Sequence, residues 1–528
     1  MPDDLSATTG RADADVFRQI AGAEAVTVDL SRRALLSQDI WAAGESVAEL
    51  VVAPAETSVL AAVVAAAAAR GFAIAIRGGG MSYTRGYVPG AGRTLLLDLS
   101  RMDRVLEVRP EDMTVTVQAG CTWKTLHEAL APLGLRTPFW GPLSGITSTV
   151  GGGLSQQNAF FGSGHYGTTS ESLVSLAVVL ADGEVLRTGA LGQGHPFYRF
   201  FGPDLAGLFC GDSGVFGVKA EITLRLIRAP AHEAYASFSF KARNGAVAAL
   251  AEIARAGVAS ETCGFDPGLA EVRMRRASLV SDVKTLGNVI AKQKSLLGGL
   301  KEAAKIAAAG RGFIGAGDWS VHLVCEGRSE AAVAADLAGV RRIALEAGGR
   351  EIENTIPKVL RAQPFTPLNN VLGPGGERWV PIHGIVALSE AAACYAGIEG
   401  VLDDMRPRLQ AAGVSTGFML TTLSTNGFLI EPVFFWPEER QALHEATVEP
   451  QVLARLDRHA ANPEATALVS EARSRVIEVF AGFGAAHFQV GRTYPYMDSR
   501  DGASRRLLQA LKDAADPERR FNPGGLGL

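Results

Sequence analysis

Three consecutive glycines, Gly78, Gly79 and Gly80, constrain the fold more than any other feature of this sequence. They follow the apolar residues 72–76, which predict a short buried strand, and they precede small polar residues. Glycine allows positive φ angles and close approach of a ligand to the backbone, so successive amide N–H groups can converge on an anion. Arg77 adds a positive charge directly before the loop. We therefore predict a phosphate-binding loop at this strand end.

The residues around this loop predict a β-α-β unit. A strand at 49–53 leads into an alanine-rich helix at 56–70, which Gly71 ends before the strand that carries the glycines. Ligands of such units gather at the carboxyl ends of the strands. Further strands are predicted at 95–99, 105–108, 114–118, 173–180, 184–187 and 222–227.

After Pro230 the pattern changes to longer helices between fewer strands. Strands are predicted at 320–325, 380–388 and 427–435, and helices at 331–347, 390–412 and 438–456. Strands that alternate with crossing helices in this way predict an α+β fold.

The length of 528 residues exceeds one ordinary core, so we expect several domains. The predicted parts are a loosely ordered lead-in with one short helix at 1–45, a first domain at 46–229, a second domain at 230–480 and a C-terminal segment at 481–528. Residues 284–310 of the second domain carry five lysines. The simpler interpretation is a solvated helix face, and the alternative is docking to an acidic membrane or protein.

The composition narrows the class of protein. A hydrophobic share of 47% with 20% charged residues is typical of globular proteins, and the net charge of -4 argues against nucleic acid as a main partner. The N-terminus has no apolar signal segment, and no apolar run is long enough to span a bilayer. Five scattered cysteines without a Cys-x-x-Cys pair indicate free thiols in a reducing compartment and no zinc site. We therefore expect a cytoplasmic protein without a bound metal.

The glycine loop matches neither of the two commonest phosphate-binding loops, the dinucleotide-binding loop and the Walker A loop. Gly78–Gly80 does not open a helix as a dinucleotide-binding loop does, and the Gly-Lys-Ser/Thr of a Walker A loop is absent. Two further segments rich in glycine follow, at 141–153 and at 212–218. A long ligand such as FAD needs several such contact loops, for its pyrophosphate, isoalloxazine and ribityl-adenine parts.

Four motifs then occur in order: Arg77-Gly-Gly-Gly-Met-Ser82, Thr149-Val-Gly-Gly-Gly-Leu-Ser155, Val178-Val-Leu-Ala-Asp-Gly183 and Gly211-Asp-Ser-Gly-Val-Phe-Gly-Val218. This set resembles the FAD-binding domain of the vanillyl-alcohol oxidase / p-cresol methylhydroxylase family of flavoproteins, over about residues 45–228. Asn522-Pro-Gly524 resembles the closing motif of the family. The resemblance implies a two-domain α+β fold with a PCMH-type FAD domain, a substrate-binding cap domain over the flavin ring, and a C-terminal segment that returns to the FAD domain.

The resemblance also implies which residues hold FAD. Residues 77–82 would bind the pyrophosphate, 142–155 would line the flavin, and 214–218 would bind through their backbone. The implied cofactor-binding residues are Arg77, Gly78, Gly79, Gly80, Met81, Ser82, Pro142, Ser148, Thr149, Gly151, Gly152, Ser155, Gly214, Gly217 and Val218. Some relatives carry a histidine in place of Met81 that bonds covalently to the flavin, and others a cap histidine where Trp379 stands here. We therefore predict noncovalent FAD.

The candidate catalytic residues are His383 in the second domain and His487, Arg492 and Tyr494 in the C-terminal segment. An extended chain at 492–496 would place Arg492, Tyr494 and Tyr496 on one face, where two phenols beside a guanidinium could stabilise a phenolate or a carboxylate. The alternative is a structural cluster at a domain joint. Trp379, Pro381 and His383 alternate on one strand, and Glu431 needs a partner, such as His383, if it is buried. The candidate substrate-binding residues are Trp379, Glu431, Phe435, Tyr496 and Trp140.

These residues predict an FAD-dependent oxidase or dehydrogenase that moves a hydride from an alcohol or a para-substituted phenol to flavin N5. The alternatives are a D-2-hydroxy acid dehydrogenase and a non-catalytic flavin-binding electron carrier. Gly417-Phe-Met-Leu420 and Ala486-His487-Phe488 stand where the hydroxy-acid branch has its metal-site motif and its Glu-His-Gly motif, which weighs against that branch. The residues leave the electron acceptor open between oxygen and a cytochrome-type protein. They also leave the oligomeric state open, although the resemblance allows a homodimer because relatives are commonly dimers.

Overall fold

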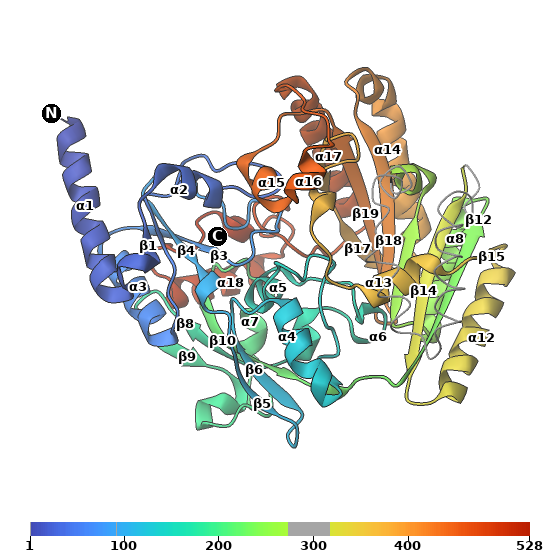
Figure 1. Ribbon diagram of the computed structural model, residues 1–528, viewed down its shortest axis with the longest axis horizontal. Coiled ribbons are helices and arrows are strands. Elements are labelled where there is room, and N and C mark those ends of the chain that lie inside the picture. Colours follow the sequence, from blue (N-terminus) through green and yellow to red (C-terminus); the bar gives the residue numbers. More distant parts are fainter. Residues whose placement is uncertain (1, 91, 273–316) are drawn as a thin grey trace. The chain divides into compact units, whose positions relative to one another are not determined.

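The computed structural model describes residues 2–90, 92–272 and 317–528, with side chains from residue 12 onward. The basic segment at 284–310 lies outside these residues. The chain divides into two compact units, shown in Figure 1. Unit 1 comprises Met1–Asn158, Thr169–Arg228 and Phe488–Leu528, and unit 2 comprises Ala159–Thr168 and Ala229–His487.

The first sheet of unit 1 contains the predicted β-α-β unit. Its strand order is β1 (Val26–Thr27), β2 (Leu50–Val52), β4 (Thr94–Asp98) and β3 (Ala73–Arg77). Both β2 and β3 run parallel to β4, and helix α3 (Thr57–Ala69) connects β2 to β3. The carboxyl ends of these three strands therefore share one edge of the sheet, and the glycine loop begins at that edge.

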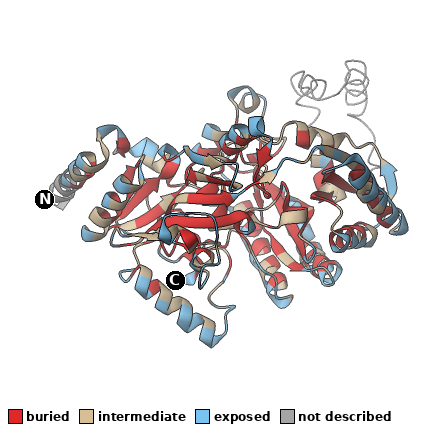
Figure 2. Ribbon diagram, turned by 90° about the horizontal axis from the view of Figure 1, so that it is seen from below, coloured by how far each residue is buried: buried red, intermediate tan, exposed pale blue. Residues whose placement is uncertain are grey.

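A second, antiparallel sheet completes the core of unit 1. Its order is β5 (Val105–Arg109), β6 (Thr114–Gln118), β10 (Val218–Arg225), β8 (Leu173–Val179) and β9 (Val185–Arg187). Helix α3 contacts β3 of the first sheet and both β8 and β10 of the second, and its Leu60, Val63 and Val64 have no exposed surface. Figure 2 shows most of the strand residues as buried. The alanine-rich helix therefore joins the two sheets through one apolar layer.

The N-terminal residues form more structure than the sequence predicts. Two helices, α1 (Pro2–Ala21) and α2 (Leu30–Leu36), replace the expected lead-in with one short helix. The Phe17 ring is fully buried and lies edge-on to Phe72, with 6.0 Å between the ring centroids. The Asp13 carboxylate pairs with Arg93 at 2.6 Å. These contacts make the segment part of unit 1, and they were not predicted because each joins residues far apart in the sequence.

Unit 2 is built on one antiparallel sheet. The strand order is β15 (Arg350–Ile352), β12 (His232–Phe240), β14 (Trp319–Gly327), β13 (Glu261–Phe265), β18 (Ser415–Leu423), β19 (Gly427–Trp436) and β16 (Arg378–Pro381), and β17 (Gly384–Ala387) also pairs with β19. Helices α8 (Arg243–Ala256), α12 (Glu330–Glu346), α14 (Ala391–Ala411) and α17 (Pro463–Gly482) pack against strands of this sheet. The α+β fold class predicted from the sequence is confirmed.

Several predicted boundaries are wrong in unit 2. The helix predicted at 438–456 is two short helices, α15 (Ala442–Thr447) and α16 (Pro450–Leu453), because Pro450 lacks the N–H that a continuous helix needs. The strand predicted at 380–388 divides into β16 and β17. Helix α17 and strand β18 were not predicted.

The division into units also differs from the predicted domains. Ala159–Thr168, predicted in the first domain, belongs to unit 2. The amide of Gly164 donates to the Ser260 carbonyl at 2.9 Å, and the amide of Gly162 donates to the Glu261 carboxylate at 2.8 Å. Residues 481–487 belong to unit 2 as well, where Ala486 pairs with Ile385.

Candidate functional site

The three glycines after β3 lie against the second glycine-rich segment. A Cβ on Gly78 would come within 2.5 Å of Thr149 Oγ1, and a Cβ on Gly79 would overlap the Thr147 carbonyl oxygen. Gly80 has a φ of +72°, which residues with a side chain rarely adopt. The close approach of two backbone segments therefore requires glycine at these positions.

The loop presents a row of backbone donors. Among the described residues, no hydrogen bond uses the amide N–H groups of Gly79, Gly80, Met81 or Ser82. The Tyr87 hydroxyl donates to the Gly80 carbonyl at 2.9 Å and so holds the loop in place. Backbone N–H groups rarely lack a partner in a folded chain, and a row of them is a site for an anion such as a pyrophosphate. The predicted phosphate-binding loop therefore fits the structure.

The positively charged side chain of Arg77 lies beside the amide groups of the glycine loop. The side chain is 8% exposed, and its guanidinium carbon lies 5.7 Å from the centre of the Tyr87 ring. Its Nη1 donates to the Gly78 carbonyl over 3.4 Å, which is a long hydrogen bond. The guanidinium therefore supplies a positive charge close to the loop amides.

The second segment is ordered by its own hydroxyl groups. Thr149 Oγ1 accepts from the amide of Gly152 at 3.1 Å at the start of α5 (Val150–Gln156), and Ser148 Oγ lies 2.6 Å from Ser144 Oγ. A Cβ on Gly151 would come within 2.7 Å of the Ala119 Cβ, so this glycine serves close packing. The carbonyl of Pro142 closes the preceding turn by accepting from Gly145 at 2.9 Å.

The third segment joins the second and ends in the sheet. The amide of Ser213 donates to the Ser155 carbonyl at 3.0 Å, and Gly214 has a φ of +71°. A Cβ on Gly217 would come within 2.7 Å of Val178. Val218 begins β10, where it pairs with Val179. The backbone of Val218 is thus used in sheet pairing.

Asn522 forms hydrogen bonds both with β3, which leads into the glycine loop, and with the third glycine-rich segment. Its Oδ1 accepts from the amide of Ile76 at 3.1 Å, and its Nδ2 donates to the Ser213 carbonyl at 2.6 Å. Phe521 bridges Ile74 in parallel at the edge of the first sheet. The closing motif therefore completes the scaffold under the glycine loops.

In unit 2, a different group of predicted residues gathers on the paired strands β16, β17 and β19. Trp379 pairs with Phe435, Pro381 pairs with Val433, and Gly384 pairs with Ile430. The two pairings keep the same register on either side of Ile382 and His383, which lie between β16 and β17, so continuing this register aligns His383 with Glu431. His383 has no exposed surface and Glu431 is 8% exposed. The aromatic pair Trp379–Phe435 and the aligned residues His383 and Glu431 therefore lie four residues apart along the same strands.

His487 joins this group through the backbone of His383. The chain at Ala486 pairs with Ile385 through two hydrogen bonds of 2.8 and 2.9 Å, and His487 Nδ1 lies 2.8 Å from the His383 carbonyl oxygen. A carbonyl oxygen only accepts, so Nδ1 carries the proton and Nε2 carries the lone pair. Burial lowers the pKa of His487, which keeps its imidazole neutral at pH 7.

The electrostatic environment of His383 includes a residue that sequence reasoning missed. Burial holds the pKa of His383 well below its usual range, and it is lowered further by His487 when that imidazole is protonated and by the positive charge of Arg473. Arg473 lies on α17 and is 5% exposed. It follows Val469 by four residues on a helix whose buried residues recur every three or four positions. A buried arginine on such an apolar stripe is a signal that could have identified it.

A family model described as an FAD binding domain matches residues 48–189 of this chain. Its range includes the glycine loop and the segment at 141–153. Among solved structures, p-cresol methylhydroxylase (PCMH) with substrate bound has the same fold, with a TM-score of 0.72 and 18% identity over 98% of this chain and 96% of the other. The chain is a flavoprotein with a PCMH-type FAD-binding domain. FAD is its cofactor, and the row of amides after β3 is where this domain would hold the pyrophosphate.

Further proteins share the fold or part of the sequence of this flavoprotein. The 4-ethylphenol oxidase from Gulosibacter chungangensis has a TM-score of 0.67 and 18% identity over 98% of this chain and 97% of the other. "Glycolate oxidase subunit GlcD" of Bacillus subtilis is 30% identical over 212 residues, which are 40% of this chain and 44% of the relative. "D-lactate dehydrogenase [cytochrome] 1, mitochondrial" of Saccharomyces cerevisiae is 30% identical over 34% of this chain and 30% of the relative. This chain therefore spans less than half the length of these two curated relatives.

The remaining candidate residues, Arg492, Tyr494, Tyr496 and Trp140, belong to unit 1. Residues 490–496 form turns, with hydrogen bonds from Tyr494 to Val490 and from Tyr496 to Tyr494, so the expected extended segment is wrong. Gly491, with a φ of +53°, turns the chain there. The Arg492 guanidinium donates to the carbonyls of Val88, at 2.8 Å, and Pro523, at 3.1 Å. These contacts favour a structural role for Arg492.

Two of the three aromatic candidates of unit 1, Trp140 and Tyr496, have aromatic or cationic neighbours. Trp140 is 4% exposed and stacks on His127, with 5.1 Å between the ring centroids. The guanidinium carbon of Arg500 lies 5.0 Å from the centre of the Tyr496 ring.

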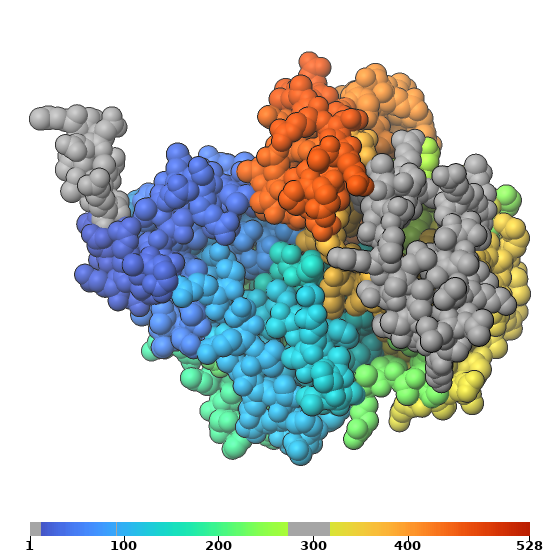
Figure 3. Space-filling view, in the orientation of Figure 1, coloured from blue at the N-terminus to red at the C-terminus, as the bar shows by residue number. Residues whose placement is uncertain are grey.

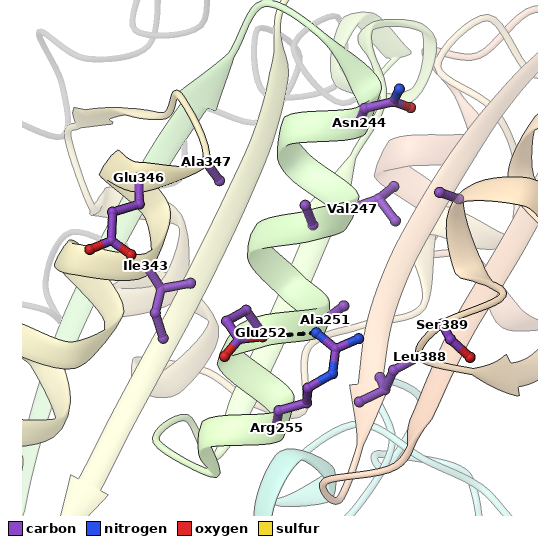
Figure 4. A pocket seen from close by; sticks show the side chains of 12 residues that line it. Asn244, Val247, Ala251, Glu252, Arg255, Ile343, Glu346, Ala347, Leu388 and Ser389 are labelled. Atoms are coloured by element: carbon purple, nitrogen blue, oxygen red, sulfur yellow. Dashed lines mark hydrogen bonds and ion pairs between the residues drawn. The ribbon is translucent and has the colours of Figure 1, made fainter.

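Two other features of the described residues lie apart from these sites. A hollow of about 370 Å³ lies between α8, α12 and the start of α14, and none of the predicted site residues lines it. Its lining includes the apolar side chains of Val247 and Leu388 and the ion pair of Glu252 and Arg255 (Figure 4). In the same described residues, no three His, Cys, Asp or Glu side chains are grouped so as to hold a metal ion. None of the described helices has both the length and the apolar composition needed to cross a membrane.

Proposed function

We propose that this flavoprotein is an FAD-dependent oxidoreductase that oxidises an alcohol or a para-substituted phenol. Bound FAD would supply the acceptor for a hydride, at N5 of the flavin. The chain must bind the substrate, orient it and remove the proton of its hydroxyl group. The hydrogen bond from His487 Nδ1 to the His383 carbonyl carries this proposal, because it leaves the lone pair on Nε2 of a neutral, oriented imidazole.

In this proposal His487 is the general base. Its Nε2 takes the proton of the substrate hydroxyl, and its lowered pKa keeps it unprotonated at neutral pH. His383 positions His487 through its carbonyl, and in this proposal the carboxyl of Glu431, which the strand register aligns with His383, helps to bind the substrate. Trp379 and Phe435 pair across the strands four residues away from His383 and Glu431, and in this proposal they offer aromatic faces to a phenol ring.

A 2-hydroxy acid is the second candidate substrate. The buried guanidinium of Arg473 acts electrostatically on His383, and arginine pairs with carboxylates through two parallel hydrogen bonds. The names of the matched relatives, a glycolate oxidase subunit and D-lactate dehydrogenases, support the same substrate class.

An anaerobic screen for flavin bleaching separates these candidates. We expect bleaching by phenols or aryl alcohols that a chelator does not change. Bleaching by D-2-hydroxy acids alone would replace the first candidate with the second, and bleaching by no substrate would favour a non-catalytic electron carrier. Reoxidation of the bleached protein by oxygen or by a cytochrome then identifies the acceptor. The cytoplasmic location stays a prediction, which cell fractionation tests.

The role of His487 is tested by His487→Gln. Loss of a general base lowers kcat by about 10²–10⁴-fold. In the wild type, kcat/KM should fall as the pH drops through a value below about 6.5, where His487 becomes protonated, and this acid limb should disappear in the variant. His459→Gln, which removes a histidine bonded to the Gly375 carbonyl, is the matched control and should leave both the rate and the profile unchanged. An unchanged acid limb in His487→Gln would reject the assignment.

A further inference from the structure

A buried amide oxygen beside the glycine loops of unit 1 accepts no hydrogen bond from the described residues. It is the Oε1 atom of Gln156, the last residue of α5. The space-filling view in Figure 3 shows closely packed blue, cyan and teal side chains over the visible face of unit 1. An acceptor enclosed in a packed protein costs free energy unless a donor reaches it, so such an atom usually faces a ligand or an ordered water. The proposed reaction does not use Gln156.

The backbone on both sides of Gln156 is strained and fixed. Gln157, which ends α5, has a φ of +57°, and Gln489 has a φ of +50°, values that residues with a side chain rarely adopt. The amide of Gln489 donates to the Gln156 carbonyl at 2.7 Å, and its Nε2 donates to the Tyr83 hydroxyl at 3.1 Å. Strained backbone of this kind gathers at ligand-binding sites, where it holds a group in place before the ligand arrives.

The side-chain amide of Gln156 lies against the residues that follow the glycine loop. A Cβ on Gly86 would come within 2.8 Å of Gln156 Nε2 and within 3.6 Å of the Gly491 Cα. Glycine at position 86 therefore leaves the space that this amide occupies. Neighbouring backbone, and not solvent, sets the direction of the Gln156 side chain.

Helix α5 separates Gln156 from the expected position of the pyrophosphate. The helix begins beside the glycine loop, where a Cβ on Gly78 would come within 2.5 Å of Thr149 Oγ1. Its seven residues extend over about 10 Å, at about 1.5 Å per residue. A comparable distance separates the pyrophosphate of FAD from the far edge of the isoalloxazine ring. Gln156 therefore stands at the ring end of the cofactor site.

FAD supplies a donor that matches this oxygen. In the oxidised isoalloxazine ring the N3–H group is the hydrogen-bond donor, and the carbonyl oxygens and the other ring nitrogens only accept. The loop amides and Arg77 are donors, so they suit the pyrophosphate and cannot accept from N3–H. An amide oxygen at the ring end of the site is complementary to N3–H.

We propose that Gln156 Oε1 accepts a hydrogen bond from the N3–H group of the flavin and so orients the isoalloxazine ring on unit 1. The assignment requires bound FAD, and it is independent of the substrate and of the general base.

Titration of the full-length apoprotein with FAD and with 3-deaza-FAD, in which a C–H replaces N3–H, tests this proposal. The wild type should bind 3-deaza-FAD about tenfold more weakly than FAD, because Oε1 is left without a donor. Gln156→Met has a similar length and no amide acceptor, so it should bind the two cofactors within about twofold of each other. The matched control is Gln193→Met, at an exposed position of unit 1, which should keep the preference of the wild type.

Gln156→Glu provides a second, opposite change. A carboxylate accepts a stronger hydrogen bond than an amide, so at about pH 8, where it is ionised, the preference for FAD should rise to roughly a hundredfold. Each result is a ratio of two affinities for one protein, so a change in the stability of the apoprotein cancels. An equal preference in the wild type and Gln156→Met would overturn the proposal. A preference in Gln156→Glu no larger than that of the wild type would overturn it as well, since the amide would then donate to the ring or not reach it.

Discussion

Gly79 stands where two backbone segments of unit 1 meet, with the Thr147 carbonyl in the space that a side chain would occupy. Gly79→Ala must therefore push the loop amides away from their positions. We expect FAD affinity to fall at least about tenfold, because the pyrophosphate loses aligned donors. Titration of the apoprotein by flavin fluorescence measures this loss. Gly400→Ala, on helix α14 with no atom near its added Cβ, is the control and should bind FAD as the wild type does.

At the scale of single residues, the sequence predicts contacts between residues close together in the chain and misses contacts between residues far apart in it. The glycine loop was predictable because a glycine run after an apolar strand is visible within a dozen residues. The bond between His487 and His383 joins positions about a hundred residues apart, and Arg473 acts on His383 from a helix that was not predicted. The residues 492–496 were interpreted as extended because alternation was counted there, whereas Gly491 and local hydrogen bonds form turns.

Helix α18 (Gly502–Ala515) anchors the closing segment of unit 1 through a buried ion pair. Lys512 donates to Asp516 at 2.6 Å and to the Val215 carbonyl at 2.7 Å, and both charged residues have no exposed surface. Lys512→Met would leave the Asp516 carboxylate buried without its cation, at a cost of about 3–5 kcal/mol in the free energy of unfolding. Urea denaturation measures this loss. The double variant with Asp516→Asn should recover most of it, and equal losses in the single and double variants would contradict the argument.

Strands β13 and β18 of unit 2 are linked by Asp266, whose Oδ1 accepts from the amides of Phe418, at 2.7 Å, and Leu269, at 2.8 Å. Burial raises the pKa of Asp266 to about 6 from an ordinary 3.8. The folded protein therefore binds the proton more tightly than the unfolded chain does, so this contribution to stability is complete below pH 3.8 and is lost as the pH rises through 6.

Asp266→Asn keeps the Oδ1 acceptor and removes the buried charge. We expect it to be more stable than the wild type above pH 6, by up to about 3 kcal/mol, with the difference vanishing towards pH 4. Melting temperature measured against pH tests this expectation. Asp501→Asn, at an exposed helix start where hydrogen bonds lower the pKa of the carboxyl, should show the opposite sign. A pH-independent effect of Asp266→Asn would refute the assignment.

For the molecule as a whole, the absence of a histidine at position 81 predicts that protein and cofactor separate on unfolding. When the FAD-loaded protein is denatured, all of its flavin should pass through an ultrafiltration membrane that retains the polypeptide. Mass spectrometry of the retained chain should give the mass of the polypeptide alone. An added flavin mass would show that another side chain has taken the role that histidine has in some relatives.

The pairing of the closing motif with β3 has a consequence for how the chain folds during synthesis. Phe521 and Asn522 pair with β3 near the beginning of the chain, while every residue of unit 2 lies between Ala159 and His487. A ribosome therefore delivers all of unit 2 before the last residues needed under the glycine loop, Phe521 and Asn522, have been added. Unit 2 can reach its native packing first, and the cofactor-binding unit must wait for the end of translation. Nascent chains halted before residue 520 should accordingly hold a folded second unit and no FAD.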